Sequence, residues 1–336
     1  MEPAAPFFLS QAMRRVFILL IKLSVSGLLL YLALTWVNIG TVVGRLREID
    51  PRWAALLLLA PLTQNFLASL RWQAILRQCG ANFPLGQLFR YGMAALFFNQ
   101  TLPSGFAGDG VRIWLAGKQI DWRAATYSVL IDRVVGVVAL AVLVTACLPW
   151  SMQLVRNPIG RTALLLIGLG SIAAGIVFVS LSWQRLRFLQ RWRLTHHLAA
   201  TATVTAAILR SPAAVTGIFG LSFLNHFVTV IMAWCAARAV GAQLPLLYAL
   251  FLVLPVILIA IVPVSIAGWG IREGAMVAAF GYAGLTPSDG LIVSLLYGAG
   301  NLAIGALGGL VWALSNRPRE GLAATVIGDD RRETTR

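Results

Sequence analysis

The chain has 336 residues, of which 59% are hydrophobic and 12% charged, and its formal net charge is +15. Ordinary soluble domains are about 45–50% apolar and about 25% charged, so this composition excludes a soluble globular protein and indicates an integral membrane protein. The basic residues flank apolar stretches, where anionic lipid headgroups are the nearest partners. We therefore expect the positive charge to face membrane lipid and not nucleic acid.

Long stretches that are nearly free of charge predict the membrane spans, because about 20 apolar residues are needed to cross a bilayer. Six full spans are expected, at 16–37, 53–70, 124–148, 161–182, 213–237 and 290–315. Two more apolar stretches, 85–106 and 244–284, are interrupted by glycine, proline and charged residues. The connection 183–212 and the tail 316–336 are too short to fold alone, so residues 1–336 are expected to form a single membrane domain.

The loop charges predict the orientation, because Lys and Arg accumulate on the cytoplasmic side of a membrane protein. Arg14 and Arg15 precede the first span, and the connection 183–212 contains five arginines. Both regions, and the tail 316–336, are therefore expected in the cytoplasm, with both termini. The segment 38–52 is then outside although it also contains three arginines, which Glu48 and Asp50 partly offset.

A short pattern of proline, glycine and arginine occurs twice, 160 positions apart. Residues 102–112 read LPSGFAGDGVR and residues 262–272 read VPVSIAGWGIR. We interpret the match as an internal duplication, with repeat A at about 53–148 and repeat B at about 213–315. Three full spans separate the two motifs, so the second copy would have inverted topology, an architecture found in many secondary transporters.

The interruptions predict places where the chain enters the bilayer and turns back. A broken helix frees backbone N–H and C=O groups, which persist in a membrane only where protein buries them or where they line a wet cavity. We therefore predict re-entrant helix–loop–helix hairpins at 85–117 and 244–284, with Pro103 and Pro263 ending the entering helices. The alternative at each place is a single span kinked by proline. The predicted fold class is an all-α polytopic membrane protein.

Three acidic residues lie in apolar surroundings, and each has an arginine nearby: Asp109 with Arg112, Asp132 with Arg133, and Glu273 with Arg272. The functional hypothesis is that Arg112 and Arg272 bind an anionic headgroup, because the guanidinium group matches phosphate oxygens. Loop N–H groups around Gly108 and Gly268 would add positive potential.

The three acids would then gate the site or couple it to protons. The structural alternative is that Asp109 and Glu273 cap helix starts and that Asp132 and Arg133 neutralise each other. Asn99, just before the first break, would hydrogen-bond the substrate or satisfy loop carbonyl groups.

Enzyme signatures are scarce in this sequence. Cys79, Cys147 and Cys235 are dispersed and indicate apolar filler in place of a disulfide framework or a zinc site. The sequence has no phosphate-binding GxxxxGK[ST] motif and no Ser-His-Asp set that the topology would bring together. We therefore expect no metal and no cofactor, and a transporter more than an enzyme.

The sequence resembles the flippase-like family named for the transmembrane half of lysylphosphatidylglycerol synthases. The resemblance rests on three segments over about residues 15–315: Asn99 with Leu102-Pro103 and Ala107-Gly108-Asp109…Arg112; Asp132-Arg133…Gly136; and Pro263-Val264-Ser265-Ile266-Ala267-Gly268-Trp269-Gly270-Ile271-Arg272-Glu273-Gly274. Ala107 stands where many relatives have glycine, a small change that is compatible with the turn.

The resemblance implies an inner-membrane protein with paired re-entrant regions that moves lipids or lipid-linked precursors between leaflets. The aminoacylating synthases carry a soluble transferase domain in addition, so lysyl transfer is not expected from this membrane domain. Two alternatives stay open. One is a membrane-embedded transferase in lipid, hopanoid or polyprenol-glycan synthesis, with Asp109 as the base on a lipid hydroxyl; the other is a non-catalytic partner of lipid-biosynthesis enzymes.

Overall fold

A computed structural model describes residues 39–102, 106–180, 212–261 and 268–315, together with scattered positions between 24 and 35. In these ranges the chain is helical and contains no strand. The expected span 16–37, the connection 183–212, the tail 316–336, and both Pro103 and Pro263 lie largely or wholly outside the described residues.

The helices follow one another in two series. The first series comprises α2 (Ile39–Arg47), α3 (Pro51–Gln78), α4 (Leu85–Thr101), α5 (Ala107–Gly117), α6 (Trp122–Leu154) and α7 (Pro158–Ser180). The second series comprises α9 (Pro212–Ala239), α10 (Leu246–Ala260), α11 (Ile271–Tyr282) and α12 (Pro287–Ser315).

Four of the described helices are long and apolar enough to cross a membrane, namely α3, α6, most of α9 and α12. They contain the expected spans 53–70, 124–148, 213–237 and 290–315, and each extends beyond the predicted range at one end or both. Helix α7 and helix α10 hold shorter apolar stretches, Pro158–Ala173 and Leu246–Ala260. The protein is therefore an all-α membrane protein with several apolar helices.

Helices α3 and α6 both begin after an aspartate that caps the helix N-terminus. Asp50 accepts a hydrogen bond from the backbone N–H of Arg52 at 2.8 Å, and Pro51 occupies the first turn of α3. Asp121 accepts from the backbone N–H of Arg123 at 2.9 Å at the start of α6. An aspartate before the first helical residue satisfies N–H groups that lack partners within the helix, which fixes where each long helix begins.

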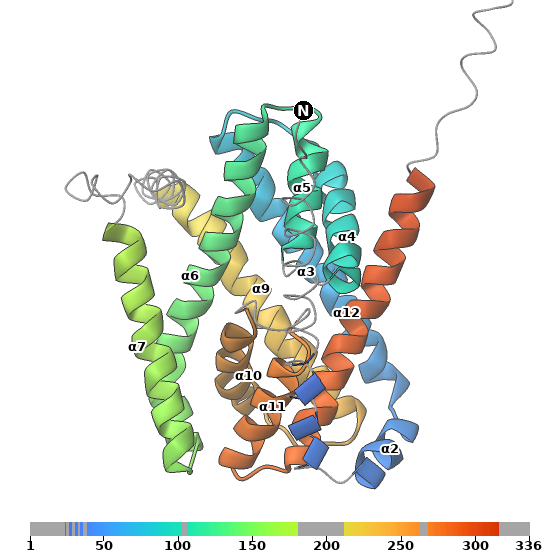
Figure 1. Cartoon of the computed structure of the whole chain (residues 1–336), viewed down its shortest axis with the longest axis vertical. Helices are drawn as coiled ribbons and strands as arrows, with labels where there is room; N and C mark the ends of the chain where they lie inside the picture. The colour runs from blue at the N-terminus through green and yellow to red at the C-terminus, as the bar shows by residue number, and fades with distance from the viewer. Residues whose placement is uncertain are drawn as a thin grey trace, which may run out of the picture.

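The short helices lie in two groups, one in the upper half and one in the lower half of the molecule (Figure 1). Helices α3, α6, α9 and α12 extend through much of its height, whereas α4 and α5 lie in the upper half and α10 and α11 in the lower half. Helix α4 packs against α5 and α12, and α10 packs against α11, α9 and α6. The short helices therefore form two packed pairs, α4 with α5 and α10 with α11.

Helices α3 and α9 run in opposite directions through the bundle (Figure 1). The backbone N–H of Asp50, before α3, donates to the carbonyl of Ala239, the last residue of α9, at 2.8 Å. Farther along the two helices, Gln64 donates to the hydroxyl of Thr229 at 2.7 Å. These contacts join the first series to the second along one antiparallel pair.

The order and lengths of the helices repeat between the two series. Helices α3 to α6 contain 28, 17, 11 and 33 residues, and α9 to α12 contain 28, 15, 12 and 29. The turns after α3 and α9 also match in sequence, since residues 80–85 read GANFPL and residues 241–246 read GAQLPL.

The two turns have the same backbone geometry. Gly80 has a φ of 78° and Gly241 a φ of 69°, both in the left-handed region that favours glycine. The N–H of Ala81 donates to the carbonyl of Leu76 at 2.9 Å, and the N–H of Ala242 donates to the carbonyl of Ala237 at 2.9 Å. Both helices thus end in the same hydrogen-bonded cap.

Candidate functional site

Asp132 lies at the centre of a buried cluster formed by α3, α5 and α6. Its Oδ1 atom is 2.7 Å from Nε of Arg71, and its Oδ2 atom is 2.9 Å from Nη1 of Arg112. The Asp132 side chain is 2% exposed. Its partners come from two other helices and not from the adjacent Arg133, so the self-neutralising pair of Asp132 and Arg133, which was the structural alternative, does not form.

Arg133 contacts Asp109 on α5. Its Nε atom lies 2.5 Å from Oδ2 of Asp109, and Nη1 of Arg112 lies 3.7 Å from Oδ1 of the same carboxylate. Consecutive residues on a helix point in different directions, which explains why Asp132 and Arg133 serve different partners. Arg133 has a 41% exposed side chain, whereas the side chain of Arg112 is 11% exposed.

We call the residues Arg71, Asp109, Arg112, Asp132 and Arg133 the five-residue network. Three arginines and two aspartates give it one positive charge in excess. It brings together four of the predicted site residues, and Arg71 joins them. Arg71 also donates to the hydroxyl of Ser222 on α9 at 3.1 Å, so the network connects the first series of helices to the second.

Arg112 is held from a second side by an aromatic ring. The centre of its guanidinium group lies 4.1 Å from the centroid of the Trp72 ring, a favourable arrangement of a cation on a π face. The indole N–H of Trp72 donates to the hydroxyl of Ser128 on α6 at 3.1 Å. Trp72 is 1% exposed, so its buried ring packs against one face of the Arg112 guanidinium.

The second predicted arginine, Arg272, belongs to a separate and electrically neutral cluster. Its Nη2 atom is 2.7 Å from Oε1 of Glu273, and its Nε donates to the hydroxyl of Ser294 on α12 at 3.0 Å. That hydroxyl donates in turn to Glu273 at 2.8 Å. The Arg272 guanidinium lies 5.1 Å and 5.3 Å from the ring centroids of Trp269 and Tyr297.

Glu273 also caps the start of α11, which agrees with the structural alternative for this residue. Its Oε2 atom accepts from the backbone N–H of Gly270 at 2.6 Å. The facing helix fits closely around the cluster, because a Cβ atom at Gly298 would lie 2.5 Å from Nη2 of Arg272. The charge of Arg272 is therefore compensated by Glu273 within the protein.

The two short helices α5 and α11 place their acids, and not their arginines, at matching positions. Asp109 is the third residue of α5 and Glu273 is the third residue of α11. Arg112 is the sixth residue of α5, whereas Arg272 is the second residue of α11. The sequence match at a spacing of 160 aligned the arginines because it ignored the different lengths of the segments that precede the helices.

The remaining predicted residues support the turns between the short helices. The side-chain Oδ1 of Asn99 accepts from the backbone N–H of Gly108 at 2.8 Å. A Cβ atom at Gly108 would lie 2.5 Å from the carbonyl oxygen of Ala95, so only glycine fits there. Gly268 has a φ of 78°, which favours glycine for conformational reasons.

Six residues of these clusters were not identified from the sequence: Arg71, Trp72, Ser128, Ser222, Ser294 and Tyr297. Arg71 had the clearest signal, because it follows directly on the expected span 53–70 and α3 continues through it to Gln78. A charge at the edge of an apolar run ordinarily marks the end of a span, which is why the prediction stops before Arg71. The structure keeps Arg71 within the helix because Asp132 neutralises it.

Metal chemistry has no candidate centre in the described ranges. No group of three or more His, Cys, Asp or Glu side chains is close enough there to hold a metal ion. The charged clusters are instead sets of arginine, carboxylate and hydroxyl groups.

Comparison with known proteins identifies the family. The profile described as "Lysylphosphatidylglycerol synthase TM region" matches residues 19–309. The chain belongs to this family. The match includes all five members of the network and the Arg272–Glu273 pair, and with the apolar helices it indicates a multi-pass membrane protein. No curated protein matches the chain.

Proposed function

We propose that the protein is a lipid flippase or transporter that moves an anionic phospholipid or lipid-linked precursor between the leaflets of the inner membrane. The observation that carries this proposal is the five-residue network. It holds one more positive than negative charge within the helices of the bundle, and its Arg133 side chain is 41% exposed. An anionic headgroup would complete the charge balance.

Arg133 is the group that a headgroup reaches first in this proposal. A phosphate oxygen would compete with Asp109 for the Arg133 guanidinium, because phosphate and carboxylate both match its planar set of donors. Asp109 would then be free to pair more closely with Arg112, from which it is 3.7 Å away. Each buried charge keeps a partner during the exchange, which avoids the cost of an unpaired charge in the membrane.

The proposed route requires access from both sides of the membrane. We propose that α4 with α5, and α10 with α11, are re-entrant hairpins of two inverted repeats. Helix α5 has 11 residues and α11 has 12, whereas about 20 residues are needed to cross the hydrocarbon core. The opposite directions of α3 and α9 support an inverted relation between the repeats (Figure 1). Both termini would lie in the cytoplasm.

Movement of labelled lipid in proteoliposomes of purified protein tests the transport proposal. We expect fluorescent phosphatidylglycerol to cross faster than phosphatidylcholine with the same label. Arg133→Gln and Arg112→Gln should each slow the anionic lipid about tenfold, the effect of losing about 1.4 kcal/mol of stabilisation at the barrier. Arg123→Gln is the matched control, because Arg123 is exposed near the start of the same helix α6.

Two results would contradict the proposal. One is equal movement of both lipids that neither network variant slows although both variants fold. The other is a lack of movement by pure protein combined with a new lipid product when a group donor is added, which would indicate a transferase.

A further inference from the structure

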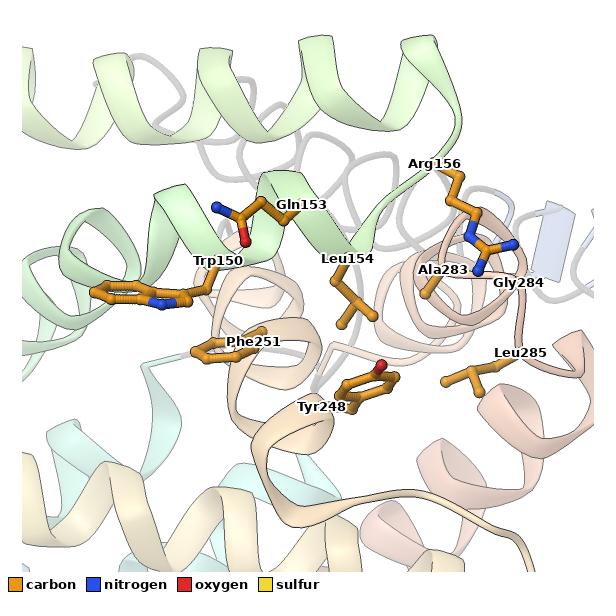
Figure 2. Close-up of a pocket in the computed structure, with 9 residues that line it drawn as sticks. All are labelled: Trp150, Gln153, Leu154, Arg156, Tyr248, Phe251, Ala283, Gly284 and Leu285. Carbon is orange, nitrogen blue, oxygen red and sulfur yellow. The ribbon is translucent and has the colours of Figure 1, made fainter.

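A cleft lies at the lower end of the molecule, between the end of α6, the start of α10 and the turn that joins α11 to α12 (Figure 2). Its volume is about 440 Å³. Helix α5, which carries Arg112, lies in the other half of the molecule (Figure 1). The cleft is therefore separate from the five-residue network.

The lining of this cleft combines one positive charge with aromatic and polar groups. Arg156 is the only charged residue among the described residues that line it. In Figure 2 its guanidinium group lies beside Ala283 and Gly284, and the hydroxyl of Tyr248 points toward the same space. No carboxylate in the described ranges forms an ion pair with Arg156, and its side chain is exposed.

An apolar groove lies next to the cleft, between α7, α10 and α11. The two spaces share Phe251, and the groove has a volume of about 120 Å³. Small side chains leave room along it, including Ala163 on α7 and Ala278 on α11, and Ile259 lines it farther along α10. These two neighbouring spaces match a molecule whose polar end lies in the cleft and whose apolar end lies in the groove.

The cleft also lies at the end of a helix that is long and apolar enough to cross a membrane. It is lined by the last residues of α6, where the chain leaves a membrane-spanning helix. Trp150 is 55% exposed there and its ring stacks on Phe251, with 6.3 Å between centroids and an interplanar angle of 8°. Trp and Tyr side chains are enriched at this level of membrane proteins because their rings are amphipathic.

We propose that this cleft and groove bind a phospholipid with an anionic headgroup. The phosphate lies against Arg156, with the Tyr248 hydroxyl facing the same space, and part of one acyl chain lies in the groove between α7 and α10. Charge complementarity selects an anionic lipid, and the apolar groove beside the polar cleft selects a lipid over a free phosphate. Binding here does not require that the protein transports lipid.

Photo-crosslinking tests this site directly. Purified protein in nanodiscs is irradiated with phosphatidylglycerol that carries a diazirine on one acyl chain, and the modified peptides are identified by mass spectrometry. We expect modification at residues 160–167 and 251–259 that exceeds the modification by a phosphatidylcholine with the same diazirine chain. Arg156→Gln should reduce it about tenfold, as expected for the loss of a charged hydrogen-bond partner.

Two further variants keep the result interpretable. Arg52→Gln removes an exposed arginine near the start of α3, at the same end of the molecule, and should leave the crosslinks unchanged. Ala163→Phe fills the groove and should remove the α7 crosslinks. Equal labelling by both lipids that Arg156→Gln does not change, or no labelling of the two segments, would overturn the proposal. Neither result depends on lipid movement, so a failure here is distinguishable from a failure of the transport proposal.

Discussion

The two series of helices, α3 to α6 and α9 to α12, have the same order of helices but different net charges in their buried clusters. Helices α3 to α6 hold three arginines against two aspartates, whereas α9 to α12 hold Arg272 against Glu273. Arg133 gives the first cluster a partly exposed cation, and Ser294 and Glu273 enclose the cation of the second. Two series with the same helix order can therefore differ in charge, with an excess positive charge in the first and a neutral ion pair in the second.

The largest expected effect comes from breaking the centre of the five-residue network. Asp132→Asn leaves Arg71 and Arg112 buried without their carboxylate, and the loss of one partner from a buried ion pair costs about 3–5 kcal/mol. We expect a marked fall in the thermal unfolding temperature of the protein in detergent.

A double variant provides the control for this prediction. Asp132→Asn combined with Arg71→Gln should lose less stability than the sum of the two single changes, because the pair acts as a unit. Additive losses would show that Asp132 and Arg71 do not interact as described.

A second pair of variants compares the acids at matching positions of α5 and α11. Glu273→Gln leaves Arg272 without charge compensation in an enclosed site, and we expect a loss of about 3 kcal/mol. Asp109→Asn should cost about 1 kcal/mol or less, because Arg133 reaches solvent and Arg112 keeps Asp132. Chemical unfolding of both variants measures the difference. Equal losses would contradict the contrast between an enclosed and a partly exposed cluster.

The matching turns provide a smaller test, in which the two halves should behave alike. Gly80→Ala and Gly241→Ala each place a Cβ atom on a left-handed backbone, at a cost of about 1–2 kcal/mol. No heavy atom would lie within 4 Å of a Cβ atom at either position, so the cost is conformational. Gly110→Ala is the control in open space without a positive φ. Unequal losses at the two turns would indicate that they are not equivalent.

The smallest effect is expected from the ion pair between α2 and α12. Arg45 on α2 lies 2.5 Å from Asp289 on α12, with side chains 35% and 13% exposed. An ion pair near the surface contributes about 0–1 kcal/mol, so Arg45→Gln should shift the unfolding temperature little. A loss as large as that of Glu273→Gln would mean that α2 anchors the bundle.

The sequence predicted the helical class and the positions of four long helices, because long apolar runs are local signals. It also identified Asp109, Arg112, Asp132 and Arg133 as charged residues in or near apolar segments. It did not predict which charges pair, because the partners that lie on different helices are 20 to 61 positions apart in the sequence. Pairing by adjacency therefore assigned Arg133 to Asp132, and the packing assigns it to Asp109.

The similar helix order of the two series was also only partly visible in the sequence. The motifs at 102–112 and 262–272 drew attention to Arg112 and Arg272, but helix α5 begins five residues before Arg112 and α11 begins one residue before Arg272. The turns at 80–85 and 241–246 are the clearer match, since four of their six residues are identical. Helix starts depend on packing and on the caps that it permits, which a fixed spacing does not capture.

Cysteine accessibility at the two matching turns tests the proposed inverted repeats most directly. Asn82→Cys and Gln243→Cys are placed singly in a protein whose three native cysteines are replaced by alanine, and Gln119→Cys serves as a second marker for the end that holds Asn82. A membrane-impermeant maleimide added to one side of sealed vesicles should label position 243 or positions 82 and 119, but not both groups. Labelling of positions 82 and 243 from the same side would contradict the inverted repeats and the transport route built on them.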